Sequence, residues 1–230
     1  MAWIGALVSD RDVILGRVRE ALADVPAGEA LAFDAADAGA EARYERAGTR
    51  GAAERLALFV ERCADYRAVA TVCAEDPTAI AEAVGTACAR HEARRLVVPN
   101  GLDPGWLPAS IEAVADEPPL PLADLFASEG VITGCELAIA VTGTVALAAG
   151  PGQGRRALSL LPDLHVCVVR AEQVVETVPE AFDQLAPGVA ERRAITFISG
   201  PSATSDIELK RVEGVHGPRR LELIVTDPAL

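Results

Sequence analysis

Lysine is almost absent from this chain of 230 residues: of the 21 basic residues, only Lys210 is a lysine. Asp and Glu number 34, which gives a formal net charge of −13 and a pI near 4.7. A chain this acidic repels the phosphates of nucleic acids and anionic lipid surfaces, so neither is expected as a partner. Arginine and alanine are abundant throughout, which indicates a compositional bias of the genome rather than a function.

Clustered cysteines are also missing. The five cysteines are an odd number, and they form no Cys-x-x-Cys pair. Zinc and iron–sulfur sites need closely spaced ligands, so the sequence predicts no metal and identifies no cofactor. We expect buried, reduced thiols in a cytoplasmic protein. The first eight residues lack the basic region of a signal peptide.

Residues 131–150 form an apolar run with a single charge, Glu136. A run of this length is compatible with a membrane-spanning helix. However, Thr142-Gly143-Thr144 lies in its second half, and such a segment is typical of a turn between two strands. We therefore predict buried strands at 137–141 and 144–148, and no membrane span.

The pattern becomes regular after the first 48 residues, with strand-like and helix-like apolar segments in alternation. Several of the strands are continuously apolar, which is typical of a mostly parallel sheet covered by helices. We predict an α/β domain at 49–230 and an N-terminal helical arm at 1–48, with a helix from Ser9 or Asp10 to about Ala23. The other predicted helices lie at 51–64, 77–92, 103–113, 122–127 and 177–186, and the other strands at 68–73, 96–98, 113–115, 165–169, 194–198 and 221–226.

Two glycine-containing segments could bind an anion. Thr142-Gly143-Thr144 is a hydroxyl-flanked turn, and residues 150–154 form a glycine-rich loop followed by Arg155 and Arg156. Free backbone amides in such loops form anion cradles, and arginine adds a bidentate donor. The alternative is a tight turn and a surface loop with purely structural roles, because no Walker-type lysine or Gly-x-Gly-x-x-Gly motif specifies a nucleotide.

His165 begins a predicted strand, and Cys167 faces the same side of that strand. The pair could supply two metal ligands, but two are too few for a zinc site. A histidine with a satisfied structural hydrogen bond is the favoured interpretation.

The segment from Gly200 to Arg219 combines hydroxyls, carboxylates, a histidine and conformationally restricted backbone after a predicted strand. We expect a ligand cleft here, at the carboxyl edge of the sheet. Ser202, Asp206 and His216 include the residue types of a nucleophilic triad, but no nucleophile-elbow motif surrounds the serine. A helix capping box is the structural alternative for Glu208. In the predicted site, hydroxyls and glycines donate to an anion, carboxylates orient the histidine and arginines supply positive charge; its residues are Thr142, Gly143, Thr144, Arg155, Arg156, Gly200, Ser202, Thr204, Asp206, Glu208, His216 and Arg219.

Four segments, in order, resemble the LUD-domain family and especially its lactate utilization protein C branch. They are AIAVTGT (138–144), SLLPDLH (159–165), GPSATSDIE (200–208) and GVHGP (214–218). The resemblance implies a NagB/RpiA/CoA-transferase-like fold, that of the sugar-phosphate isomerase and CoA-transferase superfamily. It also implies an accessory subunit, without its own iron–sulfur cluster, of a bacterial system that oxidises L-lactate to pyruvate. Its implied partners are iron–sulfur protein subunits, and a small anion is a possible ligand.

Two positions depart from the family pattern. Val141 stands where relatives usually have a carboxylate, and Ala203 where they usually have a basic residue. The joint change could remove an ion pair, since losing both partners costs less than losing one, or it could mark a changed ligand site. Two other functions stay open: a stand-alone enzyme of the same superfamily acting on a CoA ester or sugar phosphate, and a non-catalytic module with a vestigial cleft.

Overall fold

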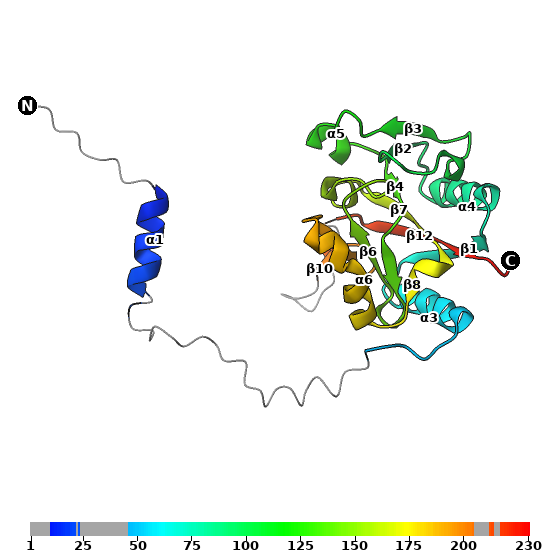
Figure 1. Cartoon of the computed structure of the whole chain (residues 1–230). Helices are drawn as coiled ribbons and strands as arrows, with labels where there is room; N and C mark the ends of the chain where they lie inside the picture. Colours follow the sequence, from blue (N-terminus) through cyan, green and yellow to red (C-terminus); the bar gives the residue numbers. More distant parts are fainter. Residues whose placement is uncertain (1–9, 22, 24–45, 205–211, 214–216) are drawn as a thin grey trace, which may run out of the picture. The chain divides into compact units, whose positions relative to one another are not determined.

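The computed structural model describes residues 10–21, 23, 46–204, 212–213 and 217–230. The chain divides into two compact units, residues 1–44 and 45–230. In the first unit, helix α1 (Asp10–Ala21) lies where a helix was predicted. The second unit holds all the other described elements (Figure 1). None of the helices in the described part of the chain has the length and apolarity that crossing a membrane requires.

The larger sheet of the second unit has six strands, all parallel, which confirms the predicted α/β class. Its central strands are buried on both faces, as their continuous apolar runs predict. In spatial order the strands are β1 (Val69–Ala74), β12 (Arg220–Asp227), β7 (Leu164–Val169), β4 (Val131–Thr133), β2 (Arg95–Val98) and β3 (Glu112–Ala115).

Helix α4 (Pro77–Arg90) covers one face of this sheet. It begins after Asp76, whose carboxylate accepts hydrogen bonds from two amides of the first turn at 2.9 and 3.1 Å. Pro77 suits this first turn because its missing N–H has no partner there anyway. The helix buries Val84 against side chains of the sheet such as Val166 and Ile224.

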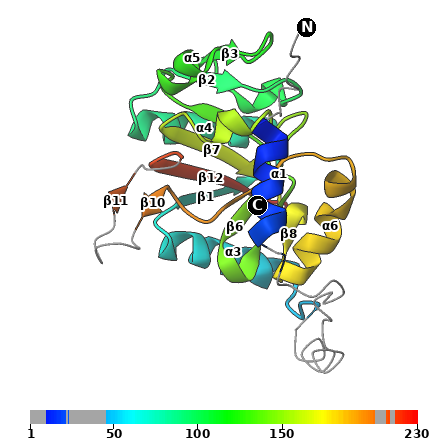
Figure 2. The same ribbon diagram turned by 90° about the vertical axis from the view of Figure 1, so that its left-hand side faces the viewer.

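A second sheet covers the other face, together with helix α3 (Ala52–Asp65). It has four strands in the order β8 (Val174–Val175), β5 (Leu137–Ile139), β6 (Thr144–Ala148) and β9 (Ile195–Ile198). β5 and β6 form the hairpin predicted around Gly143. On this face the predicted cover of helices is joined by a sheet, because both sides of the hairpin are apolar and it packs as an inner layer between the larger sheet and α6 (Val178–Ala190) (Figures 1 and 2).

Short elements complete the second unit. The helix predicted at 103–113 is only the 3-10 turn η2 (Pro104–Trp106), since Gly105 and Pro108 disfavour its continuation. The remaining elements are α5 (Leu122–Phe126), the 3-10 turns η3 (Ala140–Thr142), η4 (Arg156–Ser159) and η5 (Ala171–Gln173), and the strand pair β10 (Ala203–Thr204) and β11 (Val212–Glu213).

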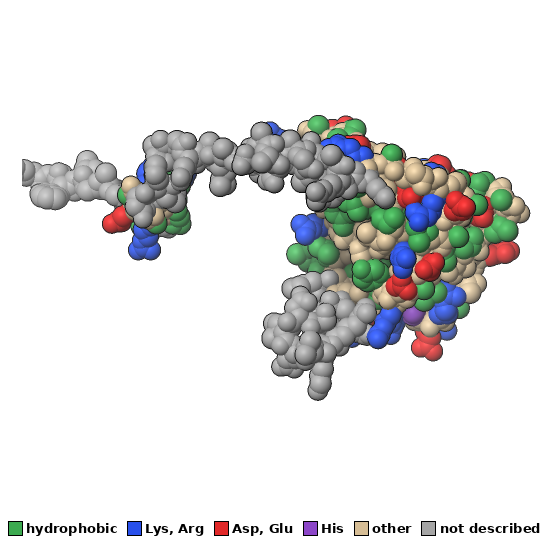
Figure 3. All heavy atoms as spheres, turned by 90° about the horizontal axis from the view of Figure 1, so that it is seen from below, with side chains coloured by type: hydrophobic (Ala, Val, Ile, Leu, Met, Phe, Trp, Pro, Cys, Tyr) green, Lys and Arg blue, Asp and Glu red, His purple; other side chains and the backbone are tan. Residues whose placement is uncertain are grey.

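The five cysteines are unpaired thiols, and four of them are buried. Burial raises the pKa of Cys63 to about 12 and that of Cys88 to about 11, so these thiols are protonated at neutral pH. On the face drawn in Figure 3, acidic and arginine side chains alternate with hydrophobic ones. The net negative charge is therefore not gathered into a single patch on that face.

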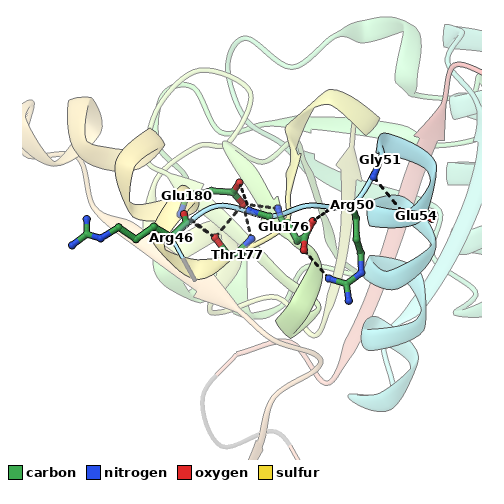
Figure 4. Close-up of polar contacts among 8 residues, drawn as sticks. Arg46, Arg50, Gly51, Glu54, Glu176, Thr177 and Glu180 are labelled. Atoms are coloured by element: carbon green, nitrogen blue, oxygen red, sulfur yellow. Dashed lines mark hydrogen bonds and ion pairs between the residues drawn. The ribbon is translucent and has the colours of Figure 1, made fainter. Parts of the chain in front are cut away.

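Residues 46–51 are anchored to the start of α6 (Figure 4). Glu180 Oε1 accepts a hydrogen bond from the Gly48 amide at 2.9 Å, and Glu176 accepts from the Arg50 amide and guanidinium, both at 2.7 Å. A side chain at Gly48 has no room, because its Cβ would lie 2.3 Å from Glu176. The Arg50 amide holds the pKa of the Glu176 carboxyl below its usual value, and the Arg50 guanidinium adds to the effect.

Replacing Glu176 with Gln is expected to lower the melting temperature by several degrees at neutral pH, because the charge-assisted bonds to Arg50 are lost. The folded pKa lies below the ordinary 4.5, so this stabilisation is complete above that value and disappears as the pH falls through the folded pKa. The two melting temperatures should therefore converge in acid, as measured by circular dichroism. Glu61→Gln, at an exposed position of α3, is the matched control, and a constant gap at all pH values would contradict the assignment.

Candidate functional site

A cavity of about 270 Å³ lies between the two sheets at one end of the second unit. We call it the His165 pocket. Its walls are the end of β9 and the residues that follow, the residues before β12, and the start of β7. The described lining residues are Ser159, Leu160, His165, Thr196, Phe197, Ile198, Ser199, Gly200, Pro201, Ser202, Gly217, Pro218 and Leu221.

His165 is the second residue of β7 and is wholly buried. Its Nε2 lies 2.8 Å from Thr133 Oγ1, and its Nδ1 is buried without a hydrogen-bond partner among the described residues. Burial lowers the pKa of the ring to about 4, so the imidazole is neutral at neutral pH. A neutral imidazole has one donor and one acceptor nitrogen, and Thr133 engages only one of them. The hydrogen-bonding capacity of the other nitrogen is therefore left unused by the described residues.

A chain of hydroxyls connects the predicted Thr142–Thr144 turn to the pocket wall. Thr142 Oγ1 lies 2.8 Å from Thr144 Oγ1, which lies 2.7 Å from Ser199 Oγ. Ser199 lines the pocket next to Gly200. The structure therefore places the turn next to the segment that begins at Gly200, although the turn itself does not line the pocket.

The two predicted glycines at this place have a structural reason to be glycine. Gly143 has a φ of 59°, and a Cβ there would lie 2.6 Å from the backbone of Arg62 in α3. Gly200 has a φ of 81°, and its Cβ would lie 2.6 Å from that of Tyr66. Both glycines allow the site segments to pack against α3 and the residue after it.

The glycine-rich loop does not offer the free amides that we expected. The amide of Gly152 donates to Asn100 O at 2.8 Å, and those of Gln153 and Gly154 donate to Gly150 O at 3.1 and 2.7 Å. The loop closes on itself and on the residues after β2. An anion cradle built from these amides is therefore absent from this described segment.

The predicted arginines are dispersed. Arg155 forms a two-bonded ion pair with Asp116, each bond 2.9 Å long, and lines a different cavity. Its guanidinium lowers the pKa of the Asp116 carboxyl. Arg156 is exposed on η4, and Arg219 pairs with Asp163 beside the His165 pocket. Of these three arginines, only Arg219 is adjacent in sequence to a residue that lines the His165 pocket, Pro218.

The side chains of four predicted site residues lie outside the part of the chain that the structure describes. Asp206, Glu208 and His216 lie outside the described residues. Thr204 lies in β10, where only the backbone is described. Their place in the site stays a prediction.

The predicted position at the carboxyl edge of the sheet was wrong. β9 belongs to the smaller sheet, where it pairs antiparallel with β6. The chain then returns to the amino end of β12, which runs parallel to β7. The pocket consequently lies beside the amino ends of β7 and β12.

Sequence reasoning treated His165 as a satisfied structural residue and did not single out Ser199. The sequence did contain a signal for this site, a single histidine in an otherwise apolar strand. A buried imidazole needs a hydrogen-bond partner on each of its two ring nitrogens. Among the described residues, no group of three or more His, Cys, Asp or Glu side chains could hold a metal ion.

Comparisons with known proteins give the family. A LUD-domain profile matches residues 122–226. Lactate utilization protein C of Deinococcus radiodurans is 51% identical over 175 residues, which are 75% of this chain and 80% of that protein. Lactate utilization protein C of Bacillus subtilis is 37% identical over 98 residues, which are 41% of this chain and 40% of that protein.

The fold has a counterpart among solved structures. The crystal structure of a DUF162 family protein from Deinococcus radiodurans superposes with a TM-score of 0.68 at 41% identity, covering 78% of this chain and all of that one. This solved structure therefore resembles the α/β unit of the present chain over most of its length. The chain belongs to the LUD-domain family and is a homologue of lactate utilization protein C.

Replacing His165 with Leu is expected to flatten the pH dependence of stability between pH 6.5, the ordinary pKa, and about pH 4. Because the folded pKa lies below the ordinary one, the unfolded chain binds the proton first, and the wild type loses up to about 3 kcal/mol across this window. Leucine cannot titrate. Urea unfolding at several pH values measures the effect, and equal slopes for the two proteins would show that His165 is not buried neutral.

Proposed function

We propose that this protein is an accessory component, without an iron–sulfur cluster of its own, of a bacterial system that oxidises L-lactate to pyruvate. The observation that carries the proposal is the 51% identity to a lactate utilization protein C across 80% of its length. Iron–sulfur protein subunits are its proposed partners, and the cytoplasm is its proposed location. The unpaired cysteines agree with a reducing compartment.

We further propose that the His165 pocket binds a small anion such as a hydroxy acid. Ser159, Ser199 and Ser202 bring hydroxyl groups to its lining, and His165 adds a neutral ring nitrogen. The described lining residues include no carboxylate that would repel an anion. A pKa of about 4 makes His165 a weak base at neutral pH, which favours a role in binding over one in proton transfer.

Two alternatives compete with this function. A stand-alone enzyme acting on a CoA ester or sugar phosphate is suggested by the six parallel strands, which agree with a NagB/RpiA/CoA-transferase-like fold. Fold alone is a weak argument for chemistry. A vestigial cleft is suggested by Val141 and Ala203, and ligand binding discriminates it from the others.

Deleting the gene is expected to abolish growth on L-lactate as the sole carbon source and leave growth on pyruvate unchanged, because only the oxidation step is lost. The measurement is growth of the deletion strain with and without the gene in trans. Normal growth of the deletion strain on L-lactate would overturn the proposal. Purification of the tagged protein from lactate-grown cells, followed by iron analysis, tests the partners.

Binding at the pocket is tested by thermal shift with L-lactate, pyruvate, phosphate and CoA. A ligand that binds only the folded state at about 100 times its Kd adds roughly 2.7 kcal/mol of stability. We expect a shift with L-lactate or pyruvate that is lost in His165→Leu but kept in Glu61→Gln. No shift with any of the four compounds would favour the vestigial cleft.

A further inference from the structure

A second cavity, of about 470 Å³, lies at the opposite edge of the larger sheet. It is formed by residues 101–106 after β2, residues 134–136 after β4, residues 151–153 of the glycine-rich loop, and Arg170 and Gln173 after β7. All of these strands end at this edge, so the cavity lies at their carboxyl ends. We call it the switch-point cavity.

The topology of the sheet explains the cavity. From β2 the chain passes outward to β3 at the edge of the sheet, whereas from β4 it passes the other way, through the smaller sheet, to β7. β2 and β4 are neighbours, so the connections after them diverge. Ligands of open α/β sheets bind in the crevice where adjacent connections diverge in this manner.

The backbone of the cavity does not favour a phosphate group. The Gly134 amide donates to Gly152 O at 2.8 Å, and the Gly152 amide donates to Asn100 O at 2.8 Å. These amides are therefore already occupied. The polar and aromatic side chains of the lining are two carboxylates, two carboxamides, one indole and one guanidinium, and we look to these for recognition.

Both carboxylates retain an acceptor oxygen. Asp103 Oδ1 accepts from the Gly105 amide at 2.8 Å. Glu136 Oε2 accepts from Gln153 Nε2 at 2.8 Å and forms an ion pair with Arg193 at 3.5 Å. Among the described residues, Asp103 Oδ2 and Glu136 Oε1 have no hydrogen-bond partner. Two such acceptors in one cavity fit a ligand that carries several N–H donors.

An aromatic surface lies beside these acceptors. The Trp106 indole lines the cavity next to Gly134, where an added Cβ would stand 3.7 Å from the ring. The Arg170 side chain is 47% exposed and pairs with Glu172 at 3.0 Å. A planar ring can therefore pack on Trp106, and an anionic substituent can reach Arg170.

We propose that the switch-point cavity binds an amino-substituted planar heterocycle with an anionic substituent. The ring packs against Trp106, its N–H groups donate to Asp103 and Glu136, and the anionic group pairs with Arg170. A nucleobase of a nucleotide and a pterin with a carboxylate both have this chemistry. The proposal is independent of lactate oxidation.

The protein contains a built-in probe, because Trp3 and Trp106 are its two tryptophans. In the full chain carrying Trp3→Phe, all tryptophan fluorescence comes from Trp106. We expect AMP or GMP to change this fluorescence at saturating concentration, and ribose 5-phosphate, which lacks the base, to have no effect. Calorimetry with 6-carboxypterin tests the other source, because pterins absorb where tryptophan emits. Whichever of the two ligand types binds identifies the class of natural ligand.

Glu136→Gln and Asp103→Asn test the recognition. Each substitution replaces a carboxylate with a neutral carboxamide. Each is expected to weaken ligand binding at least about tenfold, because a hydrogen bond to a charged group is lost. Glu75→Gln, at an exposed carboxylate outside the cavity, should leave the affinity unchanged. Melting temperatures of all variants establish that they are folded.

Two results would overturn the proposal. One is the absence of binding by the nucleotides and the pterin up to about 1 mM, which corresponds to a binding free energy weaker than about −4 kcal/mol. The other is binding that Glu136→Gln and Asp103→Asn leave unchanged while both proteins are folded. Neither result bears on growth with L-lactate, so this proposal and the proposed function fail separately.

Discussion

The structure depends on the burial of two adjacent strands, β7 and β12, on both of their faces. Alternate side chains of these strands enter two separate cores: Val166 and Ile224 face α4, and Cys167 and Leu223 face α3 and the smaller sheet. A parallel sheet with apolar side chains on both faces is stable only when both are covered. The smaller sheet is therefore a required layer of the fold, and the β5–β6 hairpin that forms its centre is apolar on both sides for the same reason.

The position of the His165 pocket follows from this layering. The chain leaves the smaller sheet at the end of β9 and enters β12 at its amino end, and the described residues 199–202 and 217–218 on these two sides line the pocket at the start of β7. His165 occupies that start, where the layer between the sheets ends. The site also depends on the anchor of residues 46–51, because Glu176 binds Arg50 through its carboxylate and accepts a hydrogen bond from the Val141 amide through its carbonyl. One residue thus connects the anchor to the turn whose hydroxyls reach Ser199.

The sequence predicted those helices, strands and turns that depend on a few neighbouring residues. The helix that begins at Pro77, the apolar runs of β7 and β12 and the turn at Gly143 were all predicted, because helix starts, burial and positive φ depend on a few neighbouring residues. β4 was missed, since it has only three residues and they form part of the longer apolar run at 131–150. The second sheet was missed because only tertiary packing decides whether a hairpin joins the main sheet or lies on it. For the same reason, the pairing of Arg155 with Asp116 and the unpartnered His165 Nδ1 could not be read from spacing.

The backbone shape of the loops around both cavities is set by hydrogen bonds within the protein. Around both, the backbone groups of the turns are engaged within the protein: Gly143 donates to Ala140 O, and Gly152 donates to Asn100 O. The loop shapes therefore do not require a ligand. Exposed side chains beside these turns can then change without disturbing the layers, and Val141, which is 38% exposed while its amide donates to Glu176 O, is such a position. A charge introduced at this side chain would alter the electrostatics beside the Thr142 and Thr144 hydroxyls, whereas the hydrogen bond of the Val141 amide does not involve the side chain and would be kept.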